Sequence, residues 1–409
     1  MQTTRRSLLA TGALTALGWA ARPRTALAAL AVGPRRQEAP GGVLVTIFLR
    51  GGADGLNVVV PHGDDDYHRS RPTLGVADPV NLDGFFGLHP SLRPLLPLYE
   101  AGQMAVVHAC GSGDQTRSHF EAMATVERGA FREAGPASGW LARHLTSAPW
   151  ENESPLRAVA LGAMVPETLH GAANATAMQT LDDLKLHGPA GREAALLTSL
   201  GSLYGADRRS LLGPAGREAL AALKTLDGLS PAQRQPSHGA AYPADDLGVG
   251  LHQVATLIKA GVGLEAACLD HGGYDTHVAQ SGVLADRLKS LGASLAAFAA
   301  DLGPTLWADT TVVVLSEFGR RVEENDGAGT DHGRAGVMLA LGGRGIAGGR
   351  VHGRWPGLAP AQREGPGDLK VTTDYRNVLA EIVSLRLGNP NVEAVFPGLA
   401  REPVGVVHG

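Results

Sequence analysis

The feature that most constrains the fold is a continuous apolar run at residues 42–49 (GVLVTIFL). Strands that are buried on both faces of a parallel sheet have such unbroken apolar sequences. Further short apolar runs predict strands at residues 105–109, 157–161, 264–269, 311–315 and 337–341. Helical patterns lie between them, notably at residues 282–302 and 375–387. This alternation predicts an α/β fold with a doubly wound, mostly parallel sheet.

The chain is long for a single core. Its 409 residues exceed the roughly 250–300 that one hydrophobic core usually serves, which indicates one large domain with an insertion, or two domains. Residues 181–243 contain helical segments broken by Gly-Pro pairs and no strand pattern. The sequence GPAGREA occurs there twice, at residues 188–194 and 213–219, and proline followed by an acid is typical of a helix start. We therefore predict a helical insertion at about residues 181–243 within a domain of residues 29–409.

The N-terminus has the pattern of an export signal. Residues 4–9 (TRRSLL) pair two arginines and lead into an apolar run, residues 8–21, that is too short to span a bilayer. The small residues of the sequence ALA at positions 26–28 are typical of a signal peptidase site. We predict a twin-arginine signal peptide at residues 1–28, which delivers a folded protein to the periplasm or the exterior. An uncleaved N-terminal membrane anchor is the alternative.

Charge limits the partners of the mature protein. The chain has 36 Lys and Arg against 40 Asp and Glu, and residues 1–28 hold four of the arginines and no acid. The remainder has 32 basic and 40 acidic residues, a net charge of −8. An acidic protein without a dense basic stretch is poorly suited to nucleic acid or to anionic membrane surfaces. We expect neither as a partner, and no stable membrane insertion after signal cleavage.

The chain has two cysteines, Cys110 and Cys268, each near the end of a predicted strand. An oxidising compartment permits a disulfide between them, and two buried free thiols are the alternative.

Acidic and imidazole side chains follow the predicted strands, where open α/β sheets bind their ligands. Asp54 follows the first strand, and Asp275 and His277 follow residues 264–269. Glu317 follows residues 311–315, and His332 ends the glycine-rich loop beyond it. Mixed carboxylate and imidazole ligands bind divalent metals, so these five residues predict a metal site for zinc, manganese, magnesium or calcium.

Each of these residues also has an interpretation without metal. Asp54 suits a turn, Asp275 a helix N-cap, and Glu317 an ion pair with Arg320 or Arg321. Their shared place at one edge of the sheet favours the metal site.

A candidate catalytic group follows the strand at residues 105–109. Ser118 suits a helix N-cap, where the positive field of a helix N-terminus attracts phosphate or sulfate. Close to a metal its hydroxyl is a candidate nucleophile, with Arg117 as a candidate anion clamp and His119 beside them. The alternative is a helix cap without chemistry.

Seven motifs in this order resemble the bacterial family called domain of unknown function 1501, whose members typically carry twin-arginine signals. The motifs are residues 49–56 (LRGGADGL), 116–120 (TRSHF), 138–143 (SGWLAR), 273–277 (GYDTH), 316–320 (SEFGR), 330–333 (TDHG) and 373–376 (TDYR).

The layout is also distantly similar to the alkaline phosphatase and sulfatase superfamily, which implies an α/β/α sandwich. That resemblance makes Asp54 the first-strand metal ligand and Ser118 the nucleophile. It makes Asp275, His277, Glu317 and His332 the later acidic and histidine positions of the site. This chain departs from the superfamily at Phe318, which stands where a metal-binding histidine is expected.

These features together predict an exported metal-dependent hydrolase of small-molecule or polymeric phosphate or sulfate esters, or a related transferase. One alternative is a non-catalytic protein that keeps the fold and binds a polymer, an envelope component or a partner protein. An oxidoreductase is a third possibility, but no Gly-x-Gly-x-x-Gly element follows a predicted strand and no haem or iron–sulfur cysteine pattern is present.

Overall fold

The computed structural model describes residues 42–130, 135–173, 175–181, 192–206, 212–230 and 232–408. The predicted signal peptide, residues 1–28, lies outside these residues. Within them, no helix combines the length and the apolar character needed to cross a bilayer.

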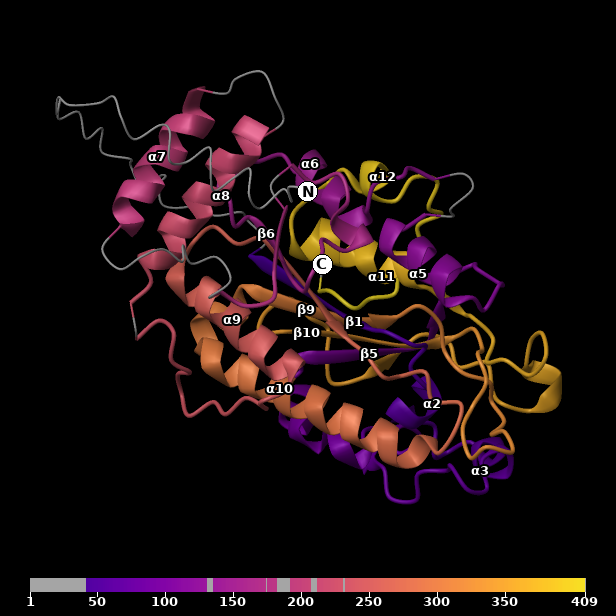
Figure 1. Ribbon diagram of the computed structural model, residues 1–409. Helices are drawn as coiled ribbons and strands as arrows, with labels where there is room; N and C mark the ends of the chain where they lie inside the picture. Colours follow the sequence, from indigo (N-terminus) through magenta and orange to yellow (C-terminus); the bar gives the residue numbers. More distant parts are fainter. Residues whose placement is uncertain are drawn as a thin grey trace, which may run out of the picture. The chain divides into compact units, whose positions relative to one another are not determined.

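A nine-stranded sheet forms the centre of the domain (Figure 1). Its strands are β1 (Val43–Leu49), β5 (Met104–Gly111), β6 (Ala158–Leu161), β7 (Ala175–Met178), β8 (Ala266–His271), β9 (Thr310–Ser316), β10 (Gly336–Gly342), β11 (Val351–His352) and β12 (Thr373–Asp374). They lie in the order β11-β5-β10-β9-β1-β8-β6-β7, with β12 also pairing with β5. Strand β10 is antiparallel to β5 and β9, and the other pairs in this sheet are parallel. The predicted mostly parallel sheet is confirmed.

Strand β1 is buried on both faces, as its unbroken apolar sequence predicts. Val43, Val45 and Ile47 contribute to one hydrophobic cluster, and Leu44 and Phe48 contribute to another. Helices cover both clusters (Figure 1). On the first face lie the 3-10 helix η2 (Pro90–Leu95), α9 (Asp246–Ala260) and α10 (Gln280–Ala308). On the second lie α5 (His119–Arg128), α6 (Trp140–Ser147), α11 (Tyr375–Glu381) and α12 (Val392–Val395).

The six predicted strands are all present, with small shifts at their ends. Strand β8 runs two residues past the predicted end, to His271. The predicted helix at residues 282–302 lies inside α10, which has a non-helical break at Gly303. The predicted helix at residues 375–387 corresponds to α11 and a short π-helix, Ile382–Arg386. The two-residue strands β11 and β12 are too short to leave a sequence pattern.

Two helices lie in the stretch predicted as an insertion, α7 (Glu193–Ala206) and α8 (Leu212–Asp227). They pack against each other. The second copy of GPAGREA lies at the start of α8, and residues 188–191 of the first copy fall outside the described residues. The exact domain boundaries stay predictions.

Both cysteines are buried and free. Strands β5 and β8 are separated by three intervening strands, which places Cys110 and Cys268 roughly 19 Å apart at ~4.8 Å per strand. This separation far exceeds the reach of a disulfide. Of the two alternatives, the structure has the free thiols.

The antiparallel direction of β10 decides which loops meet. The carboxyl ends of β1, β5, β8 and β9 lie at one edge of the sheet, and β10 begins at the same edge because Gly336 pairs with Cys110. The residues that precede β10 therefore join those that follow the parallel strands.

Asp54 lies at this edge in a closed ion pair. Its carboxylate accepts bonds from Arg71 Nη1 (2.5 Å) and Nη2 (3.0 Å), and both side chains are fully buried. Gln280 Nε2 donates a further bond of 2.6 Å to Asp54. Arg71 also donates to Asn57 and to the backbone carbonyl of Val322. The pair therefore ties the segment after β1 to the loop after β9.

Removal of the Asp54 carboxylate tests this ion pair. We expect Asp54→Ala to lower the free energy of unfolding by about 3–5 kcal/mol, because Arg71 is left buried and unpaired. The matched control is Asp66→Ala, which removes the exposed pair with Arg69 and costs less than about 1 kcal/mol. Urea denaturation measures both values, and equal losses in the two variants would contradict the structural role of Asp54.

Candidate metal centre

Three potential metal ligands from distant parts of the chain meet at this edge. His119, Asp275 and His332 each offer one donor atom, and these atoms all lie within 4.8 Å of one another. His119 is the first residue of α5, Asp275 follows β8, and His332 precedes β10. The predicted ligands Asp275 and His332 are therefore brought together, and His119 joins them.

His277 adds a fourth donor. Its Nε2 lies 3.0 Å from Asp275 Oδ1 and 3.0 Å from His332 Nε2, and those two atoms are 3.1 Å apart. On the other side, His119 Nε2 lies 3.5 Å from Asp275 Oδ2. Ligand atoms of a tetrahedral site with bonds of ~2.0–2.1 Å are ~3.3 Å apart. His119, Asp275 and His332 are thus close enough to share one ion, and His277 adjoins Asp275 and His332.

The outward nitrogen of each imidazole is held by an acceptor. A carboxylate or carbonyl oxygen can only accept, so with a metal bound each Nδ1 would carry the proton and each Nε2 would present its lone pair to the ion. Acceptors of this kind hold metal-binding histidines in many proteins. The three pairs are His119 with Glu317 Oε1 (2.8 Å), His332 with the Arg117 carbonyl (2.9 Å) and His277 with Asp331 Oδ1 (3.4 Å).

The Nε2 atom of His119, which faces Asp275, lacks a hydrogen-bond partner among the described residues. This atom is buried. A buried polar atom without a partner costs free energy, and such atoms in native proteins mark a missing ligand or a functional role. A cation between His119 and Asp275 would provide this partner, so the residues present fit a metal.

The protonation states at the site suit metal binding. Burial acts to raise the pKa of Asp275, but hydrogen bonds from Arg320 and His332 outweigh it and lower this pKa to about 2. Burial also lowers the pKa of His332 below its ordinary value. At neutral pH Asp275 is ionised and His332 is neutral, which are the forms that bind a metal.

Buried Arg320 fixes the loop that carries Asp275. Its guanidinium donates to Asp275 Oδ1 (2.6 Å), to the Gly52 carbonyl (2.7 Å) and to the Thr330 carbonyl (2.8 Å). These acceptors belong to the segments after β1, after β8 and before β10. One side chain thus holds three of the segments that form the site.

Backbone strain concentrates around the cluster. The described residues include five non-glycine residues with positive φ, and three of them adjoin the site. Arg117 (φ 55°) precedes Ser118, Ala279 (φ 48°) follows His277, and Ala328 (φ 53°) lies in the loop before His332. Such conformations are costly and recur at functional sites.

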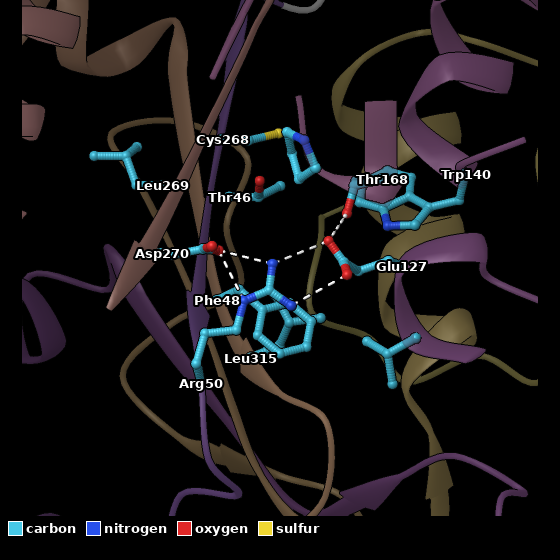
Figure 2. A pocket seen from close by; sticks show the side chains of 12 residues that line it. Thr46, Phe48, Arg50, Glu127, Trp140, Thr168, Cys268, Leu269, Asp270 and Leu315 are labelled. Atoms are coloured by element: carbon cyan, nitrogen blue, oxygen red, sulfur yellow. Dashed lines mark hydrogen bonds and ion pairs between the residues drawn. The ribbon is translucent and has the colours of Figure 1, made fainter. Parts of the chain in front are cut away.

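A partly exposed ion cluster anchors helix α5, which carries His119. Figure 2 shows Arg50 between two carboxylates. Its guanidinium makes two bonds of 3.1 Å to Glu127 of α5, and its Nε lies 2.9 Å from Asp270 of β8. The adjacent cavity of about 10 Å³ has room for about one water molecule, so it does not suit a substrate.

Several predicted site residues lie outside the cluster. Asp54 is closed by Arg71 and Gln280, and Glu317 accepts from His119 at Nδ1, the side away from Asp275. The guanidinium of Arg117 is bonded to Asp368, so it does not face the site as an anion clamp. Because these groups are already paired, we leave Asp54 and Glu317 out of the ligand set.

Ser118 and Phe318 both adjoin the cluster. Ser118 is the N-cap of α5, directly before His119, and its side chain makes no capping bond. The ring of Phe318 lies 5.0 Å from the His119 ring and 4.8 Å from the His332 ring, measured between centroids. Phe318 therefore forms an apolar wall behind two of the imidazoles.

Sequence reasoning assigned His119 to the catalytic group and did not count it as a ligand. Its position directly after the candidate N-cap Ser118 could have indicated a ligand, because the first residue of a helix that follows a parallel strand lies at the sheet edge where the other ligands were predicted. The roles of Asp331 and of the Arg117 carbonyl left no signal in the sequence.

Metal binding can be measured directly on this site. We expect the wild type to bind one equivalent of Zn²⁺, and His119→Ala and Asp275→Ala each to weaken binding by about 100-fold or more, since loss of a ligand exceeds the 10–100-fold effect of an outer partner. Occupancy should persist at pH 6.5 and fall toward pH 4, because bound imidazoles must be neutral.

Isothermal titration with Zn²⁺ and elemental analysis of the dialysed protein check these values. Exposed His68 provides the control variant His68→Ala, which should bind as the wild type does. Unchanged affinity in both ligand variants would contradict the assignment.

Several solved structures are similar to this chain. They include the lipoteichoic acid synthase from Listeria monocytogenes, at 9% identity and a TM-score of 0.31, over 74% of this chain and 66% of that one. The alkaline phosphatase of the Antarctic bacterium TAB5 aligns at 11% identity and a TM-score of 0.31, over 74% and 92% of the two chains. The phosphonate monoester hydrolase of Agrobacterium radiobacter aligns at 12% identity and a TM-score of 0.23, over 73% and 68%.

No curated protein matches the chain in sequence. One family model does match, over residues 43–383, and its description reads "Protein of unknown function (DUF1501)". This match covers the described motifs from the first strand to helix α11 and confirms the resemblance seen in them. The chain therefore belongs to the DUF1501 family.

Proposed function

We propose that this protein is a metal-dependent hydrolase of phosphate or sulfate esters, or a related phosphoryl or sulfuryl transferase, that acts outside the cytoplasm. The observation that carries the proposal is the convergence of three imidazole Nε2 atoms and the Asp275 carboxylate beside the N-terminus of α5.

The ligand set is His119, His277, His332 and Asp275. A divalent cation held by these residues would supply positive charge that stabilises the oxygens of an anionic ester and lowers the pKa of a nearby hydroxyl. Three imidazoles and one carboxylate favour zinc over magnesium, calcium or manganese, which are better suited to oxygen ligands. The carboxylate of Asp54 is already paired with Arg71, so it is not available to bind a second ion. We therefore expect one metal ion per chain.

Ser118 is the proposed nucleophile. It is half-buried, adjoins the ligand His119, and its hydroxyl is not used as a helix cap. The positive field at the N-terminus of α5 would attract the anionic oxygens of the ester. Ser118 Oγ would lose its proton to solvent water and bond to phosphorus or sulfur as the bond to the leaving-group oxygen breaks. Water would then hydrolyse the ester formed on Ser118, releasing phosphate or sulfate and restoring the hydroxyl.

The geometry limits what His332 and Arg117 can do in the reaction. Both ring nitrogens of His332 are engaged, Nδ1 by the Arg117 carbonyl and Nε2 by Asp275, so His332 is not free to protonate the leaving group. The side chain of Asp275 is 48% exposed, so water has access to the site and is the proton source that we propose. Arg117 contributes through its carbonyl, because its guanidinium is bonded to Asp368.

The sequence supports a location in the periplasm or outside the cell. Residues 1–28 contain the twin-arginine motif and a predicted cleavage site. The twin-arginine pathway carries folded proteins, which suits a centre that receives its metal before export.

A non-catalytic binding protein is the second candidate. Two observations favour it: Asp54 is withdrawn into an ion pair, and Phe318 lines the cluster where a further ligand would extend it. Such a protein would keep the metal centre as a binding site for an anionic group, without turnover.

The two candidates differ in the effect of removing the Ser118 hydroxyl. We expect metal-loaded wild type to hydrolyse at least one class in a panel of phosphate monoesters, phosphate diesters, phosphonate esters and sulfate esters. Ser118→Ala should lower kcat by about 1,000-fold or more and retain its metal, because it removes only the nucleophile.

Release of chromogenic leaving groups and elemental analysis of the same samples provide the measurements. Ser202→Ala in helix α7 is the control and should be fully active, since Ser202 lies on an exposed helix surface. Metal-loaded wild type that binds these esters without cleaving any of them would support the binding protein.

A further inference from the structure

Among the described residues, no lysine or arginine is bonded to the buried carboxylate of Glu317. Its side chain is fully buried. Oε1 accepts from the Gly51 N–H and from His119 Nδ1, each at 2.8 Å, and Oε2 lies 2.9 Å from the Ser316 hydroxyl. The Gly51 and Ser316 groups are neutral, so no lysine or arginine balances the charge of this carboxylate.

Three other buried carboxylates near the site differ from Glu317 in their ion pairing. Each of them has an arginine partner. These pairs are Asp54 with Arg71, Glu127 with Arg50 and Asp368 with Arg117. An unpaired charge inside a protein is costly, because the interior solvates it poorly. Glu317 has no such partner among the described residues, so a positive charge that offsets its own would have to come from another source.

That charge can reach Glu317 only through His119 among its bonded partners. The Nδ1 of His119 is bonded to Glu317, while its Nε2 is buried, unpartnered and 3.5 Å from Asp275. A cation at Nε2 would place positive charge on the far side of the same ring. This cation would give His119 Nε2 a bonding partner and would also offset the negative charge of Glu317.

The local backbone is arranged for the bond to Glu317. Gly51 has φ +117°, and a Cβ at this position would lie 2.4 Å from the backbone nitrogen of Asp275. Only glycine allows the segment after β1 to pass so close to Asp275 and still direct its N–H at Glu317. The carboxylate of Glu317 is thus bonded to the strand edge on one side and to His119 on the other.

We propose that Glu317 is a positioning residue for the metal centre, and this inference rests on the proposed function only in its use of that centre. Glu317 fixes His119 with the proton on Nδ1, makes its Nε2 a stronger donor, and has its own charge balanced by the bound cation. Metal binding and the burial of this carboxylate are therefore linked.

The test uses Zn²⁺ alone, titrated into the full-length metal-free protein against a chromophoric chelator. Glu317→Gln keeps the shape of the side chain and removes its charge. We expect it to weaken Zn²⁺ binding by about 10–100-fold. We also expect its metal-free form to unfold at the same or a higher denaturant concentration than the wild type, because an unbalanced buried charge has been removed.

Glu381 of α11 provides a matched control. It is 7% exposed, and it accepts from the backbone N–H groups of Val404, Gly405 and Val406. Glu381→Gln removes a similar buried charge away from the centre and should bind Zn²⁺ as the wild type does. Equal weakening in the two variants would overturn the inference, since it would show a general effect of buried charge.

A double-mutant cycle shows whether Glu317 acts through His119. In the His119→Ala background, Glu317→Gln should cause little further loss of Zn²⁺ affinity. Independent, additive losses would overturn the inference, as would unchanged affinity in Glu317→Gln or a wild type that binds no Zn²⁺. The Zn²⁺ titration contains no ester, so its result does not depend on hydrolysis. If the protein hydrolysed no ester, the proposed activity would be contradicted, but the role of Glu317 in metal binding would not.

Discussion

The buried guanidinium of Arg320 holds the candidate site together. It bonds to the segment after β1, to the Asp275 loop after β8 and to the segment before β10, and it is itself fully buried. No single strand could position the ligands alone, because they come from positions more than 200 residues apart. A side chain with several donors in a fixed fork can bond to several carbonyls and a carboxylate at once. The ligand geometry depends on this one residue.

Two further features determine which residues join the centre. The antiparallel direction of β10 brings His332, which precedes its strand, to the edge where Asp275 and His277 follow theirs. The ion cluster of Arg50 with Glu127 holds α5 so that His119 meets them (Figure 2). Arg71, in contrast, neutralises Asp54 and withdraws it. The result is one imidazole-rich cluster at this edge of the sheet.

The sequence predicted the sheet well because strands buried on both faces have unbroken apolar runs, as β1 does. It also placed Asp275, His277 and His332 at one edge, since strand ends determine that position. It could not separate ligands from supporting carboxylates. Asp54 and Glu317 resemble ligands locally, but their partners are revealed only by packing: Arg71 lies 17 residues from Asp54, and His119 lies 198 residues from Glu317. The two-residue edge strands carried no periodic signal.

The central claim is that one metal ion lies between three imidazole nitrogens and Asp275. Anomalous X-ray diffraction from crystals of the mature protein, recorded on both sides of the zinc absorption edge after growth with Zn²⁺, tests it most directly. We predict one strong peak about 2.0–2.2 Å from the Nε2 atoms of His119, His277 and His332 and from an oxygen of Asp275. A map without a peak there, or with its peak at Asp54, would contradict the account.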